Sequence, residues 1–213
     1  MTLQNKKVLV TGASRGLGKS LAKSYEEAGA DVIKLTRKDC DLSKPDEIYS
    51  FVKNVGTVDV LVNCAGIFHA ENFHDMSLEQ YNECIQINLT APFILSQELS
   101  RGMIDRGWGR IVNVCSSSAY GGSPKTSVYC ASKHGLLGLS RALFSELKNK
   151  GVRVISVSPG TIKTDMGKEV ERLGQLYDTF MEPDEVADYI VYNTSLDGNM
   201  ISEEIRLNRM FIQ

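Results

Sequence analysis

The chain has 213 residues, of which 42% are hydrophobic and 23% are charged, and its formal net charge is −2. This length and composition predict a single globular domain, residues 1–213, with one sizeable core. Lysine and arginine are spread along the chain, so neither nucleic-acid binding nor a polybasic membrane patch is expected.

The chain shows no targeting or membrane signal. No apolar run approaches the roughly 18 residues that a membrane span needs, and residues 1–10 lack the long apolar region of a signal peptide. We therefore expect a cytoplasmic protein. Its five cysteines include no CxxC pair, which favours reduced, mostly buried thiols, and its three histidines are too scattered to predict a metal site.

A glycine-rich turn follows the first apolar run. Residues 6–11 predict a buried strand, and Gly12, Gly16 and Gly18 lead into an amphipathic helix that ends near Gly29. Gly12 permits a tight turn, Gly16 lets the backbone approach a ligand, and Gly18 allows close packing of the helix on the sheet. The resulting helix N-terminus suits a pyrophosphate. A turn that merely tolerates glycine is the alternative, because the spacing differs from GxGxxG.

The second predicted strand, residues 31–36, bears on the choice of dinucleotide. An acid at the end of this strand binds the 2′-hydroxyl of the adenosine ribose, whereas arginine accommodates a 2′-phosphate. Arg37 follows the strand and Arg15 lies in the glycine loop, so the sequence favours NADP(H). Asp39 leaves NAD(H) open. The alternative is that Arg37 and Lys38 are solvated loop charges.

A helix and a short strand come next. Ser43 is expected to cap a helix over residues 44–54, and residues 58–62 predict a buried strand. The small residues 63–66 end this strand at the same sheet edge as the glycine loop, where their backbone would pass beside a cofactor. On its own, Asn63 would more often be a structural cap.

The longest helical pattern covers residues 77–106. It opens with a capping box at Ser77 and is interrupted by Asn88 and Pro92. A buried asparagine beside a proline must be hydrogen-bonded, and freed backbone groups or a water are its expected partners.

The second half of the chain continues the alternation of strands and helices. A strand over 110–115 ends in three serines, and a glycine- and proline-containing loop leads to a helix that runs to about residue 150. The remaining expectations are a strand over 152–157, a polar lid over 168–181, a helix over 183–193 and a strand over 204–207. This order predicts an α/β fold, a doubly wound, Rossmann-like parallel sheet with helices on both faces.

The helix that begins near residue 127 carries Tyr129 and Lys133. Their four-residue spacing places both side chains on one helix face. A lysine ammonium beside a phenol favours the phenolate, which lets the tyrosine exchange a proton with a substrate oxygen near neutral pH. The alternative is a surface helix with an ordinary tyrosine and lysine.

Taken together, these motifs closely resemble the short-chain dehydrogenase/reductase family in its compact single-domain form. TGxxxGxG stands at residues 11–18, NNAG at 63–66 with Cys64 in place of the second asparagine, and YxxxK at Tyr129 and Lys133. Three further matches are Asn88, Ser116, which lies 13 residues before the tyrosine, and the PGxIxT segment at 159–164.

The resemblance implies a Ser-Tyr-Lys-Asn tetrad. Tyr129 would be the general acid in carbonyl reduction and the base in alcohol oxidation. Lys133 would stabilise the phenolate and bind the nicotinamide ribose, and Ser116 would bind the carbonyl oxygen. Asn88 would hold a water that links Lys133 to solvent.

The resemblance also implies a cofactor site. Asp41 and Leu42 would contact adenine, and Ile162 and Thr164 would bind the carboxamide. The complete expected set is Gly12, Ser14, Arg15, Gly16, Leu17, Gly18, Arg37, Asp41, Leu42, Asn63, Ala65, Gly66, Tyr129, Lys133, Pro159, Gly160, Ile162 and Thr164.

The chain departs from the family pattern in two places. Between the second strand and Asp41 the family usually carries a further helix, and here only residues 37–40 remain, which shortens the fold near the adenosine. The family often closes with a glycine-rich segment that helps to assemble tetramers, whereas residues 203–213 contain no glycine. We expect a homo-oligomer, a dimer or a tetramer, and favour a dimer through the helices over 77–106 and 128–150.

The leading functional prediction is NADP(H)-dependent reduction of a small-molecule ketone or aldehyde, or oxidation of the alcohol. General similarity to the 3-oxoacyl carrier-protein reductases makes a β-ketoacyl or similar small carbonyl plausible. One alternative is a dinucleotide-binding sensor or partner protein without turnover. A nucleotide-sugar epimerase or dehydratase would carry a larger C-terminal domain than the 80 residues after Lys133 allow.

Overall fold

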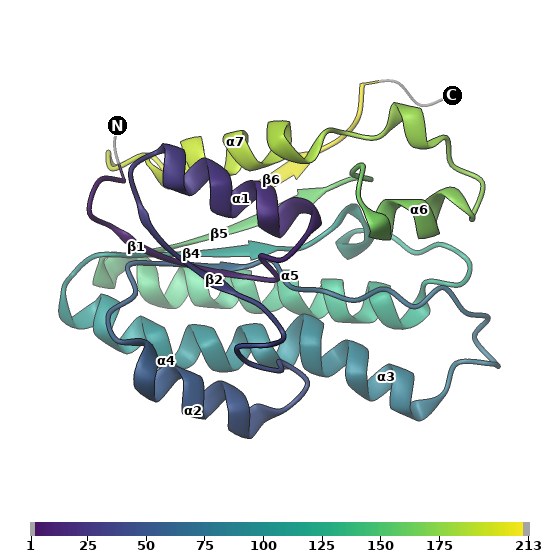
Figure 1. Ribbon diagram of the computed structural model, residues 1–213, viewed down its shortest axis with the longest axis horizontal. Coiled ribbons are helices and arrows are strands. Elements are labelled where there is room, and N and C mark those ends of the chain that lie inside the picture. Colours follow the sequence, from purple (N-terminus) through teal and green to yellow (C-terminus); the bar gives the residue numbers. More distant parts are fainter. Residues whose placement is uncertain (1–2, 211–213) are drawn as a thin grey trace.

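A parallel sheet organises the described part of the chain, residues 3–210 of this computed structural model (Figure 1). Its six strands lie in the order β2-β1-β3-β4-β5-β6. They are β1 (Lys7–Thr11), β2 (Asp31–Leu35), β3 (Val60–Asn63), β4 (Gly109–Val114), β5 (Val152–Pro159) and β6 (Glu204–Leu207). All six predicted strands are therefore present. The first two residues of the predicted domain and the last three of its glycine-free tail lie outside the described residues.

Helices cover both faces of the sheet. They are α1 (Gly16–Glu27), α2 (Pro45–Val55), α3 (Leu78–Ile85), α4 (Ala91–Asp105), α5 (Ser127–Leu147), α6 (Asp165–Glu171) and α7 (Pro183–Thr194). Helices α1 and α7 pack on one face, and α2, α4 and α5 pack on the other (Figure 1). The predicted doubly wound, Rossmann-like architecture is confirmed. No helix within residues 3–210 is both long and apolar enough to cross a membrane.

The central strands are buried on both faces, which explains their continuous apolar sequences. Alternate residues of each strand point to opposite faces. Val10, Val62 and Val112 belong to the core beneath α1 and α7. Leu9 and Ile111, one position earlier on their strands, belong to the core beneath α2, α4 and α5.

The strand order places a crevice beside β1. From β1 the chain passes first to β2 on one side, and β3 then pairs with β1 on the other side. In doubly wound sheets such a reversal leaves a crevice at the carboxyl ends of the strands. The glycine turn after β1 and the turn after β3 meet at this point.

The long helix predicted over residues 77–106 is divided into three parts. The capping box at Ser77 is confirmed, and α3 then gives way to a π-helical stretch, Gln86–Thr90, before α4 begins. Pro92 lies in the first turn of α4, where its missing N–H group costs little. Asn88 lies within the π-helical stretch, a feature that is frequent at functional sites.

Two local expectations were wrong or incomplete. Ser43 does not cap α2: Lys44 occupies that position, and the backbone N–H and hydroxyl of Ser43 both donate to Oδ1 of Asp41. The polar lid predicted over residues 168–181 contains most of α6 and a short 3₁₀ turn, Tyr177–Thr179. The polar sequence of the lid gave no indication of α6. The hydroxyl of Thr164 caps the N-terminus of this helix.

Candidate active site

The glycine turn after β1 has a conformation that requires glycine. Gly12 and Gly16 have positive φ angles of 70° and 52°. A Cβ on Gly12 would lie 2.8 Å from Cα of Ala65, so the two turns are in direct contact. Helix α1 begins at Gly16, and its N-cap residue Arg15 makes no side-chain capping bond. The first N–H groups of α1 remain available to an anion.

Thr11 joins the glycine turn to the turn after β3. Its hydroxyl accepts hydrogen bonds from the backbone N–H groups of Cys64 and Ala65, at 3.0 and 2.9 Å, and donates to the carbonyl of Val62. Sequence reasoning did not single out this residue, although it is the first position of the TGxxxGxG motif. Its side chain fixes the position of residues 64–66 beside the glycine turn.

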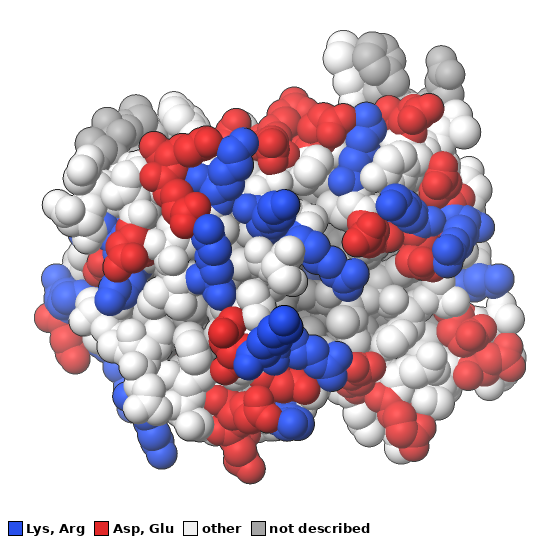
Figure 2. Space-filling model, in the orientation of Figure 1, with Lys and Arg blue, Asp and Glu red and all other residues white. Residues whose placement is uncertain are grey.

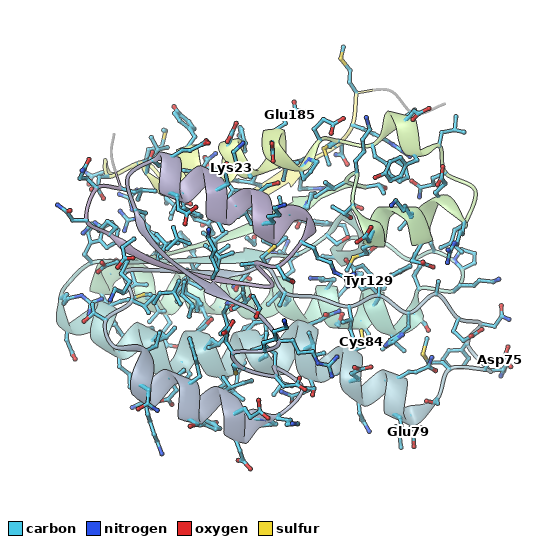
Figure 3. All side chains as sticks on the ribbon, viewed as in Figure 1. Lys23, Asp75, Glu79, Cys84, Tyr129 and Glu185 are labelled. Atoms are coloured by element: carbon cyan, nitrogen blue, oxygen red, sulfur yellow. The ribbon has the colours of Figure 1, made fainter. Side chains whose placement is uncertain are left out.

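Tyr129 and Lys133 share one face of α5, as their spacing predicts. Lys133 is 4% exposed, and its ammonium donates to the carbonyl of Val114 at 2.8 Å. Its Nζ lies 5.7 Å from the centre of the Tyr129 ring. The ring of Phe68 packs edge-on against that of Tyr129, with centroids 5.0 Å apart. In Figure 3, Tyr129 lies between α5 and α6 at the carboxyl end of the sheet.

Ser116 stands opposite this helix face, after β4. It is the N-cap of a 3₁₀ turn, Ser117–Ala119, and its Oγ accepts a hydrogen bond from the N–H of Ser118 at 3.1 Å. That bond uses a lone pair, so the hydroxyl proton is still available to a ligand. The 3₁₀ turn packs on α5, and Ser116 and Tyr129 line the same cleft.

Asn88 is fully buried behind Lys133. Its Oδ1 accepts from the N–H of Ile67 at 2.9 Å, and its Nδ2 donates to the carbonyl of Ile67 and to the hydroxyl of Ser132. A Cβ added to Gly66 would lie 3.3 Å from Oδ1 of Asn88 and 3.7 Å from Nζ of Lys133. The asparagine therefore connects the loop after β3 to α5, the helix that carries Lys133.

A cleft of about 1090 Å³ unites these groups. Its walls include the glycine turn, the ends of β3, β4 and β5, the start of α5 and the lid. Of the predicted site residues, Asn63 and Asn88 do not line it. The side chain of Asn63 is 2% exposed and donates to Asn113 and Ser96, so it joins β3 to β4 and α4. These bonds give Asn63 a structural role, although it is a bridge between strands and not the cap that the sequence offered as the alternative.

The charged side chains that follow β2 differ in whether they line the cleft. The carboxylate of Asp39 accepts hydrogen bonds from the hydroxyl and N–H of Thr36, at 2.7 and 3.0 Å, and these bonds lower its pKa. Neither Asp39 nor Lys38 lines the cleft, whereas Arg37 does. Arg37 lies 3.3 Å from Oδ2 of Asp41 and is 75% exposed. In Figure 2, lysine and arginine side chains lie on both sides of the hollow near the centre of the view.

Asp41 and Leu42 both line the cleft. The hydroxyl of Ser43, its N–H and the charge of Arg37 lower the pKa of Asp41, which therefore stays ionised at neutral pH. The carbonyl of Leu42 accepts a hydrogen bond from Gln86 at 3.1 Å, which ties this segment to the start of the π-helical stretch.

Three thiols line the cleft as neutral groups. Burial raises the pKa of Cys64 to about 12 and that of Cys40 and Cys115 to about 11, so all three remain protonated at neutral pH. All five cysteines are free, as expected from the sequence. Within residues 3–210, no group of three or more histidine, cysteine or acidic side chains is arranged to hold a metal ion.

The loop after β3 and the lid contribute cleft residues that sequence reasoning did not name. Phe68 and Ile67 follow β3, and the lid contributes apolar and polar side chains. The lid residues Val170, Arg172, Leu173 and Gln175 line the cleft, as does Met166, which precedes the lid in α6. The sequence of the lid is polar and contains no recognisable motif, so it could not identify these residues individually.

Known proteins resemble this chain in sequence and in fold. The model of the short chain dehydrogenase family matches residues 37–173. The 3-oxoacyl-[acyl-carrier-protein] reductase of Rickettsia bellii is 34% identical over 182 residues, which cover 77% of this chain and 76% of the relative. A structure described as an NAD(P) dependent gluconate 5-dehydrogenase from Beutenbergia cavernae, with NADP bound at low occupancy, has a TM-score of 0.89 and 27% identity, and the match covers 97% of this chain and 96% of that one. A 4-hydroxyisoleucine dehydrogenase complexed with NADH has a TM-score of 0.82 and 25% identity, with 96% and 98% covered.

Proposed function

This chain belongs to the short-chain dehydrogenase/reductase family, and from that premise we propose that it transfers hydride between NADP(H) and a carbonyl or alcohol substrate. The observation that carries the proposal is the cleft itself. Tyr129, Lys133 and Ser116 line the same cavity as the glycine turn, so a group bound along one wall would meet the proton-transfer residues at the other.

The residues at the cleft fit a dinucleotide. Gly12 brings the two turns into contact, and a Cβ on Gly16 would lie 3.2 Å from the side chain of Thr164. The first N–H groups of α1 suit the pyrophosphate, Asp41 and Leu42 would contact the adenine, and Ile162 and Thr164 would hold the carboxamide. When bound, the nicotinamide supplies or accepts the hydride.

The chain's own residues would handle the proton. Tyr129 would donate it to the carbonyl oxygen in reduction and remove it from the alcohol in oxidation. Lys133 has three N–H donors and gives one to Val114, so two remain for the ribose and for a water. Its charge would stabilise the phenolate, and the Ser116 hydroxyl would donate to the oxygen on which charge develops. Asn88, behind Lys133, would hold the water that returns the proton from solvent.

Preference for NADP(H) rests on the charges after β2. Arg37 lines the cleft and is exposed enough to meet a 2′-phosphate, and Arg15 in the glycine turn is a second cation. Asp39, the residue that favoured NAD(H), does not line the cleft and is occupied by Thr36. The related structures include one with NADP and one with NADH, so NAD(H) use remains the competing assignment.

The substrate class follows from the relatives. The Rickettsia relative acts on a 3-oxoacyl group, which supports a β-ketoacyl or similar small carbonyl for this chain. We also propose one domain for the whole chain and a cytoplasmic homo-oligomer, with a dimer through α3, α4 and α5 favoured. Sedimentation at several protein concentrations would distinguish a dimer from a tetramer or a monomer.

A panel of ketones and aldehydes, followed by NADPH absorbance, tests the proposal. The wild type should reduce at least one compound, and Tyr129→Phe should lower kcat by a factor of about 10²–10⁴ because the proton donor is lost. Phe68 packs against the ring, so phenylalanine should occupy the same position. Tyr192→Phe, at an exposed tyrosine of α7, is the matched control. Full activity in Tyr129→Phe would contradict the mechanism.

The second candidate is the sensor without turnover. Tight NADPH binding by a wild type that reduces no compound in the panel would favour it. The presence of Ser116, Tyr129 and Lys133 together at the cleft favours the enzyme instead.

A further inference from the structure

The lid is held by a residue from beyond the last strand. Arg209 follows β6, and its guanidinium donates to the hydroxyl of Thr179 at 2.8 Å and to Oε1 of Gln175 at 2.9 Å. It also lies over the ring of Phe180, 5.3 Å from the centre, and that ring is 4% exposed. One side chain thus contacts three residues of the lid at once.

A second contact fixes the same carboxamide. The hydroxyl of Thr161, two residues after β5, donates to Oε1 of Gln175 at 3.1 Å. Backbone bonds hold the neighbouring residues together, because the N–H of Met181 donates to the carbonyl of Thr161 at 3.1 Å. Gln175 is therefore hydrogen-bonded both to Thr161, which follows β5, and to Arg209, which follows β6.

These contacts determine which end of the amide is free. A guanidinium has only donors, so the atom that Arg209 meets must be the amide oxygen and not the nitrogen. With two donors on Oε1, the NH₂ group of Gln175 is left, and no described residue accepts a hydrogen bond from it. Gln175 lines the cleft, whereas Arg209 does not.

We propose that Gln175 is a specificity-determining residue whose NH₂ group donates a hydrogen bond to a second oxygen of the substrate, and that Arg209 is the residue that positions it. This inference rests on the proposed carbonyl reduction. It assigns the substrate a chemical class, a carbonyl compound with a further acceptor oxygen, such as the oxygen of an ester, a thioester or a carboxylate. Met166, Val170 and Leu173 supply an apolar wall on the same side of the cleft.

The test compares substrates that differ in this oxygen. The purified chain is assayed with NADPH and either ethyl acetoacetate or acetoacetate, which carry the second oxygen, or 2-octanone, which lacks it. Gln175→Met, which keeps the length of the side chain without its donors, should lower the ratio of kcat/KM for the keto ester over that for 2-octanone about tenfold. Gln175→Glu should lower it at least as much, because its carboxylate retains the bond to Arg209 but has no donor. A larger loss for acetoacetate than for the ester would identify a carboxylate as the acceptor.

The positioning role of Arg209 has its own readout. Arg209→Met should lower the same ratio about threefold, and Arg209→Lys should restore part of it, because lysine still supplies donors. Gln97→Met, at an exposed position of α4, is the matched control and should leave the ratio unchanged. A general disturbance of the lid would lower kcat/KM for all substrates alike.

The outcomes separate this inference from the proposed function. An unchanged ratio in Gln175→Met, with all substrates still reduced, would overturn the role of Gln175 and leave carbonyl reduction standing. If the wild type reduces none of the three compounds nor any in the broader panel, carbonyl reduction and this inference both fail. The expected drop in kcat for Tyr129→Phe, together with a selective loss in Gln175→Met, would support both.

Discussion

Replacing Arg37 with alanine should lower kcat/KM for NADPH about tenfold and change that for NADH by less than about twofold. A phosphate bonded by an arginine is stabilised by about 1.5–3 kcal/mol, and the low end applies here because Arg37 is 75% exposed and screened by water. About 1.4 kcal/mol corresponds to a factor of ten. Only the 2′-phosphate distinguishes the two cofactors, so the loss should be confined to NADPH.

The structure also limits the damage that this substitution does to the fold. Arg37 is bonded to Asp41, but the carboxylate of Asp41 keeps the two hydrogen bonds from Ser43 when the arginine is removed. An exposed ion pair contributes at most about 1 kcal/mol, so the melting temperature should fall by only a few degrees.

The assay is initial-rate kinetics with each cofactor at a fixed, saturating carbonyl concentration. Lys38→Ala is the matched control, because this neighbouring cation does not line the cleft. It should leave the ratio of NADPH to NADH efficiency within about twofold of the wild type, since only the long-range field changes. An equal loss with both cofactors in Arg37→Ala, or a wild type that prefers NADH, would refute the assignment of Arg37 to the 2′-phosphate.

Three further substitutions test the scaffold of the site. Thr11→Val should lower the free energy of unfolding by about 2–4 kcal/mol, because two backbone N–H groups lose their acceptor, and equal urea midpoints in this variant and the exposed Thr57→Val would contradict that role. Gly18→Ala should weaken NADPH binding at least about tenfold in a fluorescence titration, because its Cβ would lie 2.2 Å from a backbone oxygen of the glycine turn. The control is Gly138→Ala in α5, where the added Cβ meets open space. This variant should bind NADPH normally and gain up to about 1 kcal/mol in the free energy of unfolding. Hydrogen bonds from a neighbouring arginine and tyrosine lower the pKa of Glu204 below its ordinary 4.5, so its stabilising effect is present above that value and is lost as the pH falls through the lower folded pKa. The melting temperatures of wild type and Glu204→Gln should therefore differ at about pH 7 and converge toward about pH 3, and a difference independent of pH would exclude this cause.

The sequence predicts the features that depend on neighbours along the chain. The glycine turn, the capping box at Ser77 and the shared face of Tyr129 and Lys133 follow from local backbone geometry or helix periodicity. The positions of the central strands follow from short apolar runs, because a parallel strand that is covered on both faces needs few polar side chains. The order of these elements is enough to bring all the predicted site residues except Asn63 and Asn88 to one cleft.

Features that depend on distant partners were not predicted. The amide of Asn63 is occupied by Asn113, 50 residues away, and nothing in the local sequence indicates this bond. The contact between Gln175 and Arg209 spans 34 residues and joins two segments without a recognisable motif. In each case the hydrogen-bond partner is brought close by the packing of the sheet or the lid, so it can be identified only from the folded structure.

The shortened connection after β2 brings two of the predicted cofactor-binding residues, Arg37 and Asp41, into contact with each other. Because only residues 36–40 separate β2 from Asp41, the cation expected at the 2′-phosphate and the acid expected at the adenine are four residues apart and form an ion pair. A bound 2′-phosphate would compete with Asp41 for Arg37, and the affinity for NADPH would include the cost of weakening that pair. Asp41→Asn should remove the competitor and leave the hydrogen bond from Ser43 possible, so it should strengthen NADPH binding relative to NADH in a titration. Weaker relative binding of NADPH in Asp41→Asn would show that Asp41 orients Arg37 toward the phosphate instead of competing with it.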